Sequence, residues 1–161
     1  MPVGASNSER FMSQAIALAM ENVRSGKGGP FAALVVKEGK ILGQGANLVT
    51  LMNDPTAHAE ILAIRAACKK IASFELTGCD IYATCEPCPM CLGAIYWARL
   101  EKIYYAANSA DAAHAGFDDS LIYAEVKKPA AARKIPMAQL LRQDALHVFR
   151  AWEQKPDKIS Y

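Results

Sequence analysis

The spacing of apolar residues divides the first part of the chain into a helix and a hairpin. From about Glu9 to Arg24, apolar side chains recur at intervals of three and four, which predicts an amphipathic helix that ends at "SGKGGP". The next stretch, "FAALVVKEGKILGQGAN", has two apolar runs joined by a short turn containing glycine. This pattern is typical of a β-hairpin, and it ends at Asn47.

The middle of the chain predicts two helices and two strands. Asp54 and Pro55 predict the start of a helix through Cys68, because Asp caps free amides and proline suits the first helical position. The run "CDIYAT" predicts a buried strand, "PMCLGAIYWAR" a helix and "KIYYAA" a second strand. A connection of this length implies a parallel crossover, which places the cysteine-rich segment at the carboxyl end of the first strand, where ligand sites gather.

The pattern is looser in the last third of the chain. "DAAHAGFDDSLIYAEV" predicts a loop with a short helix, and Pro129 and Pro136 bracket an Ala-rich linker. A final helix with a broad apolar stripe is predicted from about Met137 to Glu153. With no internal repeat, we expect one domain over residues 1–161, in which residues 129–161 form a C-terminal arm.

Composition narrows the class of protein. A chain of 161 residues with 52% apolar and 21% charged residues is expected to fold compactly. The net charge of +2, from well-mixed basic and acidic residues, weakens the case for a nucleic-acid partner without excluding one. The most apolar segment, "FMSQAIALAM", is interrupted by Ser13 and Gln14. We therefore expect a soluble cytoplasmic protein without a membrane partner.

The five cysteines favour a metal site or catalysis over disulfide bonds, because their number is odd and three lie in one segment. In "TCEPCPMC", Cys85, Cys88 and Cys91 are evenly spaced, so two thiol pairs are conceivable. Cys88 and Cys91 surround the predicted helix start, where backbone amides stabilise thiolates, whereas Cys85 ends the strand and is expected to point elsewhere. Cys68 and Cys79 are expected to be buried apolar residues.

A third ligand is available in "PTAHAE", where His58 precedes Glu60 by two positions. One imidazole and two thiolates suit zinc and leave one tetrahedral position open. Water on such a zinc ion has a pKa of about 7 instead of 15.7, and Glu60 is the candidate that carries its proton to a substrate nitrogen. Separately, each of these residues has an ordinary structural explanation, and His114 and His147 lack cysteine neighbours.

Together these motifs match the signature of zinc nucleobase deaminases. "NDPTAHAEI" and "EPCPMCLGAIYWAR" resemble the cytidine deaminase superfamily, over most of residues 9–123. The resemblance implies an α/β fold with three α/β/α layers and a central five-stranded mixed sheet. "GGPFAALVV" and "DAAHAGFDDS" make the chain similar to the bacterial guanine deaminase branch, whose members convert guanine to xanthine and ammonia.

This resemblance implies a role for each candidate residue. His58, Cys88 and Cys91 would hold one zinc ion per subunit, and Glu60 would move protons. The residues implied in binding the purine are Phe31, Asn47, Ala59, Trp97, Asp119 and Tyr161. A carboxylate suits guanine, which offers a ring N–H where adenine offers an acceptor.

Several alternatives remain open at this level. Spacing does not decide between Asp118 and Asp119, and Trp97 either lines the pocket or packs in the core. The branch forms homodimers in which the C-terminal segment crosses to cover the partner's pocket, so Tyr161 would close a neighbouring site. A final helix packed on its own subunit fits the sequence nearly as well.

Two other functions compete with guanine deamination. A tRNA adenosine deaminase shares the zinc motifs and acts on a flipped-out adenine, but the weak charge and the "GFDDS" carboxylates disfavour it. A catalytically silent zinc scaffold that binds a partner would lack an acid–base residue, and the presence of Glu60 disfavours that reading.

Overall fold

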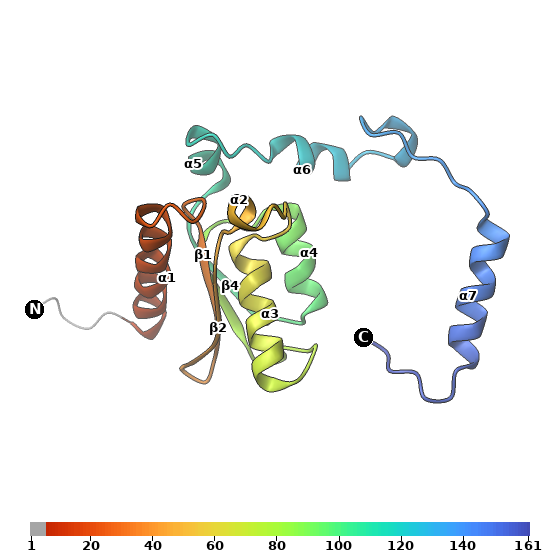
Figure 1. Cartoon of the computed structure of the whole chain (residues 1–161), viewed down its shortest axis with the longest axis horizontal. Helices are drawn as coiled ribbons and strands as arrows, with labels where there is room; N and C mark the ends of the chain where they lie inside the picture. The colour runs from red at the N-terminus through yellow and green to blue at the C-terminus, as the bar shows by residue number, and fades with distance from the viewer. Residues whose placement is uncertain (1–5) are drawn as a thin grey trace, which may run out of the picture. The chain divides into compact units, whose positions relative to one another are not determined.

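A mixed β-sheet forms the centre of the first of two units in the chain (Figure 1). The computed structural model describes residues 6–161, which divide into a unit that ends at Ser120 and a unit that begins at Leu121. The strands are β1 (Ala32–Lys37), β2 (Lys40–Ala46), β3 (Asp80–Cys85) and β4 (Lys102–Ala107). They lie in the order β2-β1-β3-β4, with β1 antiparallel to both neighbours and β4 parallel to β3.

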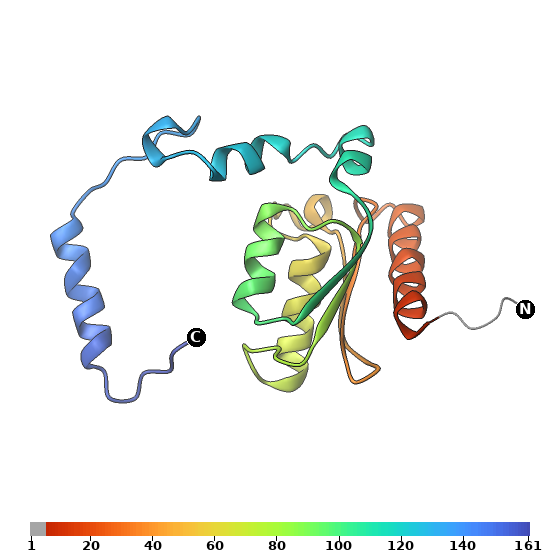
Figure 2. The same cartoon turned by 180° about the vertical axis from the view of Figure 1, so that it is seen from behind.

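Helices cover both faces of this sheet because successive strand residues point to opposite sides. Leu34 of β1 packs against Phe11 of α1 (Asn7–Arg24) on one face. Val35 packs on the other face against α3 (Ala59–Ile71), beside α4 (Pro89–Trp97). Figures 1 and 2 show α1 on one side of the sheet and α3 and α4 on the other. The predicted α/β fold with three layers is therefore confirmed.

The sheet has four strands in the described residues, where five were expected. After β4 the chain enters α5 (Ser109–His114) directly. The Asn108 side chain accepts from the Asp111 amide, and the Asp111 carboxylate accepts from the Asn108 amide. This capping box starts a helix directly after β4.

Two glycines in β2 allow α3 to approach the sheet closely. A Cβ atom at Gly43 or Gly45 would lie 2.3 Å from the main-chain oxygen of Ala63 or Ala59, respectively. The facing helix residues are themselves small and buried. This contact places the first turn of α3 beside the end of β2.

The hairpin, the parallel crossover and the first helix agree with the sequence prediction, but two helix starts do not. Asp54 and Pro55 form a turn, because the Asp54 carboxylate accepts from the Thr56 amide and hydroxyl at 2.8 and 2.7 Å. A short α2 (Val49–Met52) precedes this turn, and α3 begins later, at Ala59. The last helix, α7 (Arg142–Gln154), also begins later than the predicted Met137.

The second unit has no core of its own in the described structure. Its helices are α6 (Ser120–Val126), the 3-10 helix η1 (Ala130–Ala132) and α7, and none of the three contains a buried residue. Its exposed apolar residues include Ile122, Val126, Ile135, Met137, Leu140, Leu141, Val148, Phe149, Trp152 and Ile159. No helix in the described part of the chain is long and apolar enough to cross a membrane.

Candidate active site

One edge of the sheet brings together segments that are far apart in sequence. Ala32, at the start of β1, pairs with Ala46, at the end of β2, and Cys85 pairs with Ala107 at the ends of β3 and β4. Because β1 runs antiparallel to β3, its start lies at the same edge as the three strand ends. The residues just outside this edge are Phe31, Asn47, Glu86 and Asn108.

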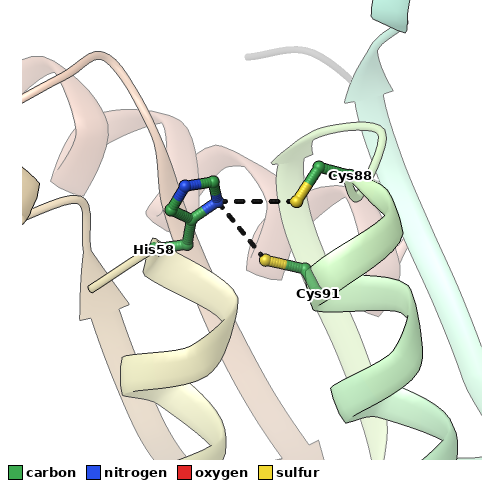
Figure 3. Close-up of side chains that lie close together, drawn as sticks. All are labelled: His58, Cys88 and Cys91. Atoms are coloured by element: carbon green, nitrogen blue, oxygen red, sulfur yellow. Dashed lines mark hydrogen bonds between the residues drawn. The ribbon is translucent and has the colours of Figure 1, made fainter. Parts of the chain in front are cut away.

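Two helices begin near this edge and supply the candidate metal ligands. His58 is the N-cap of α3, and Cys88 is the N-cap of α4, where Pro89 occupies the first turn. Cys91 follows in the same turn and is buried. Figure 3 shows the three side chains pointing toward one another from the two helix starts.

The spacing of these donor atoms fits zinc. His58 Nδ1 lies 3.6 Å from Cys88 Sγ and 3.5 Å from Cys91 Sγ, and the three donors lie within 4.8 Å of one another. Zinc bonds of about 2.3 Å to sulfur and about 2.0 Å to nitrogen at a tetrahedral angle separate these atoms by about 3.5 Å. Cys85 is outside the group, since its Sγ lies 3.6 Å from the Asn108 carbonyl oxygen.

One of the two ligand thiols is already ionised. The hydrogen bond from the Cys91 thiol, against the opposing effect of burial and with help from the His58 ring, lowers the pKa of Cys88 to about 4. The hydrogen bond to Cys88 in turn raises the pKa of His58. Cys88 is therefore a thiolate at neutral pH, which is the form that binds a metal.

Glu60 lies two residues after His58, in the first turn of α3, and is 8% exposed. Burial raises its pKa, while its own backbone hydrogen bond lowers it and the Cys88 charge raises it again. A carboxyl group that takes up a proton more readily than usual, beside a metal site, is suited to proton transfer.

The segment after β4 adds an aromatic side chain, Phe117, and a carboxylate, Asp119, to this region. The rings of Phe31 and Phe117 pack edge to face, with centroids 4.9 Å apart. Asp119 is half-buried, and its pKa is raised first by burial and next by the charge of Cys88. Asp118 is exposed and its carboxylate accepts from the Ser120 amide at 2.9 Å. Of the two aspartates, Asp119 is therefore the one whose pKa is affected by the charge of the metal ligand Cys88.

The structure does not bring every predicted residue to this cluster. Ala59 is buried between His58 and Glu60, but Trp97 ends α4, which separates it from Cys88 by about 13 Å along the helix axis. Tyr161 belongs to the second unit. The substrate-binding roles of Trp97 and Tyr161 therefore stay predictions.

Two residues of this region were missed in the sequence. Phe117 lies two positions before Asp119, so an aromatic residue beside a candidate carboxylate was an available signal. The Glu86 carboxylate accepts from the Ser109 amide at 3.0 Å, which ties the start of α5 to the cysteine loop. Only the pairing of strand ends reveals that contact.

Comparison with known proteins agrees with this arrangement. Residues 5–107 match the family model of the cytidine and deoxycytidylate deaminase zinc-binding region. The chain belongs to this deaminase family. Because the family is defined by a zinc-binding region and the donor set fits zinc, zinc is the metal of the His58, Cys88 and Cys91 site.

Within the deaminase family, the similarity differs in extent between relatives. The chain is 53% identical to guanine deaminase from Bacillus subtilis (strain 168) over 155 residues, covering 96% of this chain and 99% of that protein. The X-ray structure of guanine deaminase from Bacillus subtilis matches with a TM-score of 0.92 over 95% of this chain and 98% of that one. A tRNA-specific adenosine deaminase from Aquifex aeolicus (strain VF5) is 46% identical over 78 residues, 48% of this chain and 52% of that protein.

Proposed function

We propose that this protein is a zinc-dependent guanine deaminase, which hydrolyses guanine to xanthine and ammonia. One observation carries the hydrolytic chemistry: the buried carboxyl group of Glu60 lies beside three metal donors that leave a tetrahedral position open. The similarity to a guanine deaminase over nearly the full length of both chains favours guanine as the substrate.

The residues divide the reaction between them. When bound to His58, Cys88 and Cys91, zinc supplies the Lewis acidity that makes water a nucleophile near neutral pH. Glu60 accepts a proton from that water at a carboxylate oxygen and delivers protons to the ring nitrogen and then to the amino nitrogen. The amino group leaves as ammonia, and the oxygen of water becomes the carbonyl oxygen of xanthine.

The purine is held by the other side chains at the sheet edge. In this proposal Phe31 and Phe117, whose rings pack together, offer ring surfaces, Asn47 and Ala59 contact the base, and the Asp119 carboxylate accepts from a guanine N–H. Adenine lacks that donor, so a half-buried carboxylate would face an acceptor and lose affinity.

A purine panel with ammonia detection tests the proposal. Guanine should be deaminated, adenine should not, and a chelator should abolish turnover until zinc is restored. An anticodon-loop RNA tests the alternative of a tRNA adenosine deaminase, whose binding would weaken steeply with salt. Turnover of the RNA but not of guanine would overturn the proposal, and a zinc-loaded protein that turns over neither substrate would indicate a scaffold.

Replacing Asp119 with asparagine is expected to lower kcat/KM for guanine by about ten- to a hundredfold, because the charged acceptor of the substrate N–H is lost. Zinc content should not change. Steady-state kinetics and metal analysis measure the two effects. The matched control is Asp118→Asn, since Asp118 is exposed and should leave kcat/KM nearly unchanged. A larger effect of the control would transfer the role to Asp118.

We also infer that the protein is a homodimer in which the second unit covers the site of the partner. Residues 121–161 contain 8 basic and 4 acidic residues, net +4, whereas residues 1–120 contain 10 basic and 12 acidic residues, net −2. The second unit buries none of its helical apolar residues, and the first unit exposes Tyr96, Trp97 and Tyr105. Complementary charge and unburied apolar surface both favour association of the second unit with another surface of this chain.

Removal of residues 156–161 is expected to lower guanine turnover by at least about tenfold, if Tyr161 excludes water from the site. Zinc content and the dimer should be retained, as measured by metal analysis and light scattering. The control is Ser160→Ala in the full-length chain. A fully active truncated protein would reject the closing role of Tyr161.

Mixed dimers separate an exchanged arm from an arm packed on its own subunit. A truncated chain with intact Glu60 is mixed with a full-length Glu60→Gln chain. Exchange predicts that activity returns, because the intact arm of one subunit covers the intact metal site of the other. An arm packed on its own subunit predicts no recovery.

A cytoplasmic location is part of the same proposal. All five cysteines are free thiols in the structure, and two of them are zinc ligands that must stay reduced.

A further inference from the structure

A buried amide on α1 links two segments of the proposed purine site. Asn22 is 4% exposed, and its Nδ2 donates to the Gly29 carbonyl at 2.9 Å and to the Asn47 carbonyl at 2.8 Å. α1 covers the face of the sheet opposite to α3 and α4, which carry the metal ligands (Figure 1). Asn22 therefore reaches the site edge from the far side of the sheet.

Both carbonyls belong to segments that present a proposed substrate-binding side chain. The Phe31 amide donates to the same Gly29 oxygen at 2.9 Å, and the Asn47 amide donates to the Phe31 oxygen at 2.9 Å. The Asn47 side chain is held in turn, since its Oδ1 accepts from the Val49 amide at 3.3 Å. One amide group thus joins the loop before β1 to the end of β2.

The packing at this junction leaves little freedom. A Cβ atom at Gly28 would lie 2.0 Å from the Asn47 carbonyl oxygen and 3.3 Å from Asn22 Nδ2. The Asn22 main-chain carbonyl also accepts from the Lys27 amide at 3.2 Å. The loop before β1 is therefore hydrogen-bonded to both the main chain and the side chain of Asn22. A buried group with several partners of this kind specifies one arrangement of the chain around it.

We propose that Asn22 is a positioning residue for purine binding, which sets the backbone from which Phe31 and Asn47 contact the base. The inference rests on the proposed function, because those two contacts are part of it. The Asn22 side chain donates to the Gly29 and Asn47 carbonyls, and not to a metal donor or to Glu60. Its loss should therefore weaken binding of the base more than the chemical step.

The test uses the full-length zinc-loaded protein and the variants Asn22→Asp and Asn22→Ser. The first keeps the shape but places acceptors against two carbonyls, and the second keeps one shorter donor. We expect KM for guanine to rise about tenfold in Asn22→Asp, because the backbone that positions Phe31 and Asn47 would shift, with kcat within about twofold. Asn22→Ser should lie between Asn22→Asp and the unmodified protein. The inhibition constant of xanthine should rise in parallel with KM.

Phe11→Leu is the matched control for lost stability. Phe11 lies on the same helix and packs in the cluster on the sheet, away from the loop before β1. It should lower the melting temperature and leave KM and the xanthine constant unchanged. Unchanged constants in folded Asn22→Asp, or an equal rise in Phe11→Leu, would overturn the inference. Failure of the proposed function is distinguishable, because the unmodified protein would then not turn over guanine.

Discussion

Replacement of Glu60 by glutamine is expected to lower kcat for guanine by at least about two orders of magnitude, the size of general acid–base effects. The amide has the shape of the carboxylate, but it cannot take a proton from water and pass it to the leaving nitrogen. Glu60 is buried beside the metal ligands, so a base from the solvent cannot replace its carboxylate in the variant. Steady-state kinetics measure the loss, and metal analysis should find one zinc ion per chain in both proteins.

The control for this variant is Glu75→Gln. Glu75 is paired with Arg99 at 3.3 Å, and both side chains are 42% exposed, so this substitution changes charge in the same way at the surface. We expect kcat to stay within about twofold, because exposed ion pairs contribute little. Near-normal turnover by Glu60→Gln would contradict the assignment of Glu60 as the proton carrier.

Replacement of Cys91 by serine is expected to remove zinc and reduce guanine turnover to background. Two ligands of the His58, Cys88 and Cys91 set remain, and a hydroxyl is a poor substitute for a thiolate. The melting temperature should fall as well, since a metal that binds only the folded chain stabilises it. Zinc content, turnover and thermal unfolding are measured on the same preparation.

Cys85→Ser distinguishes the two evenly spaced thiol pairs of the cysteine segment. Cys85 Sγ contacts the Asn108 carbonyl and is not among the grouped donors. Burial raises the pKa of Cys85 to about 11. This variant should keep its zinc. Loss of zinc from Cys85→Ser but not from Cys91→Ser would reverse the ligand assignment.

Features decided by neighbouring residues were predicted well. Pro89 after Cys88 predicted a helix start, and Cys88 is the N-cap of α4. The Glu-Gly-Lys turn predicted the hairpin of β1 and β2, which pair antiparallel. Such signals are reliable because caps and turns depend on hydrogen bonds within a few residues.

Predictions failed where a local signal had two readings. The sequence predicts Asp54 as a helix cap, but its carboxylate accepts from the Thr56 amide and hydroxyl in a turn, and α3 begins at Ala59. The same side-chain hydrogen bonds serve a turn and an N-cap, so the local signal does not decide between them. The expected fifth strand is absent from the described residues, in which β4 is followed by a helix that starts at the Asn108 capping box.

The sequence by itself determined the donor types, the helix starts that carry Cys88 and Cys91, the α/β class and the presence of an acid–base residue beside His58. Only the tertiary structure decided that His58 Nδ1 faces both thiols, that Asp119 and not Asp118 is half-buried, and that Asn22 ties Gly29 to Asn47. The physical reason is the sequence separation over which each interaction acts. Caps and periodicity are set within one helical turn, whereas these contacts join residues that meet only when the sheet pairs its strand ends.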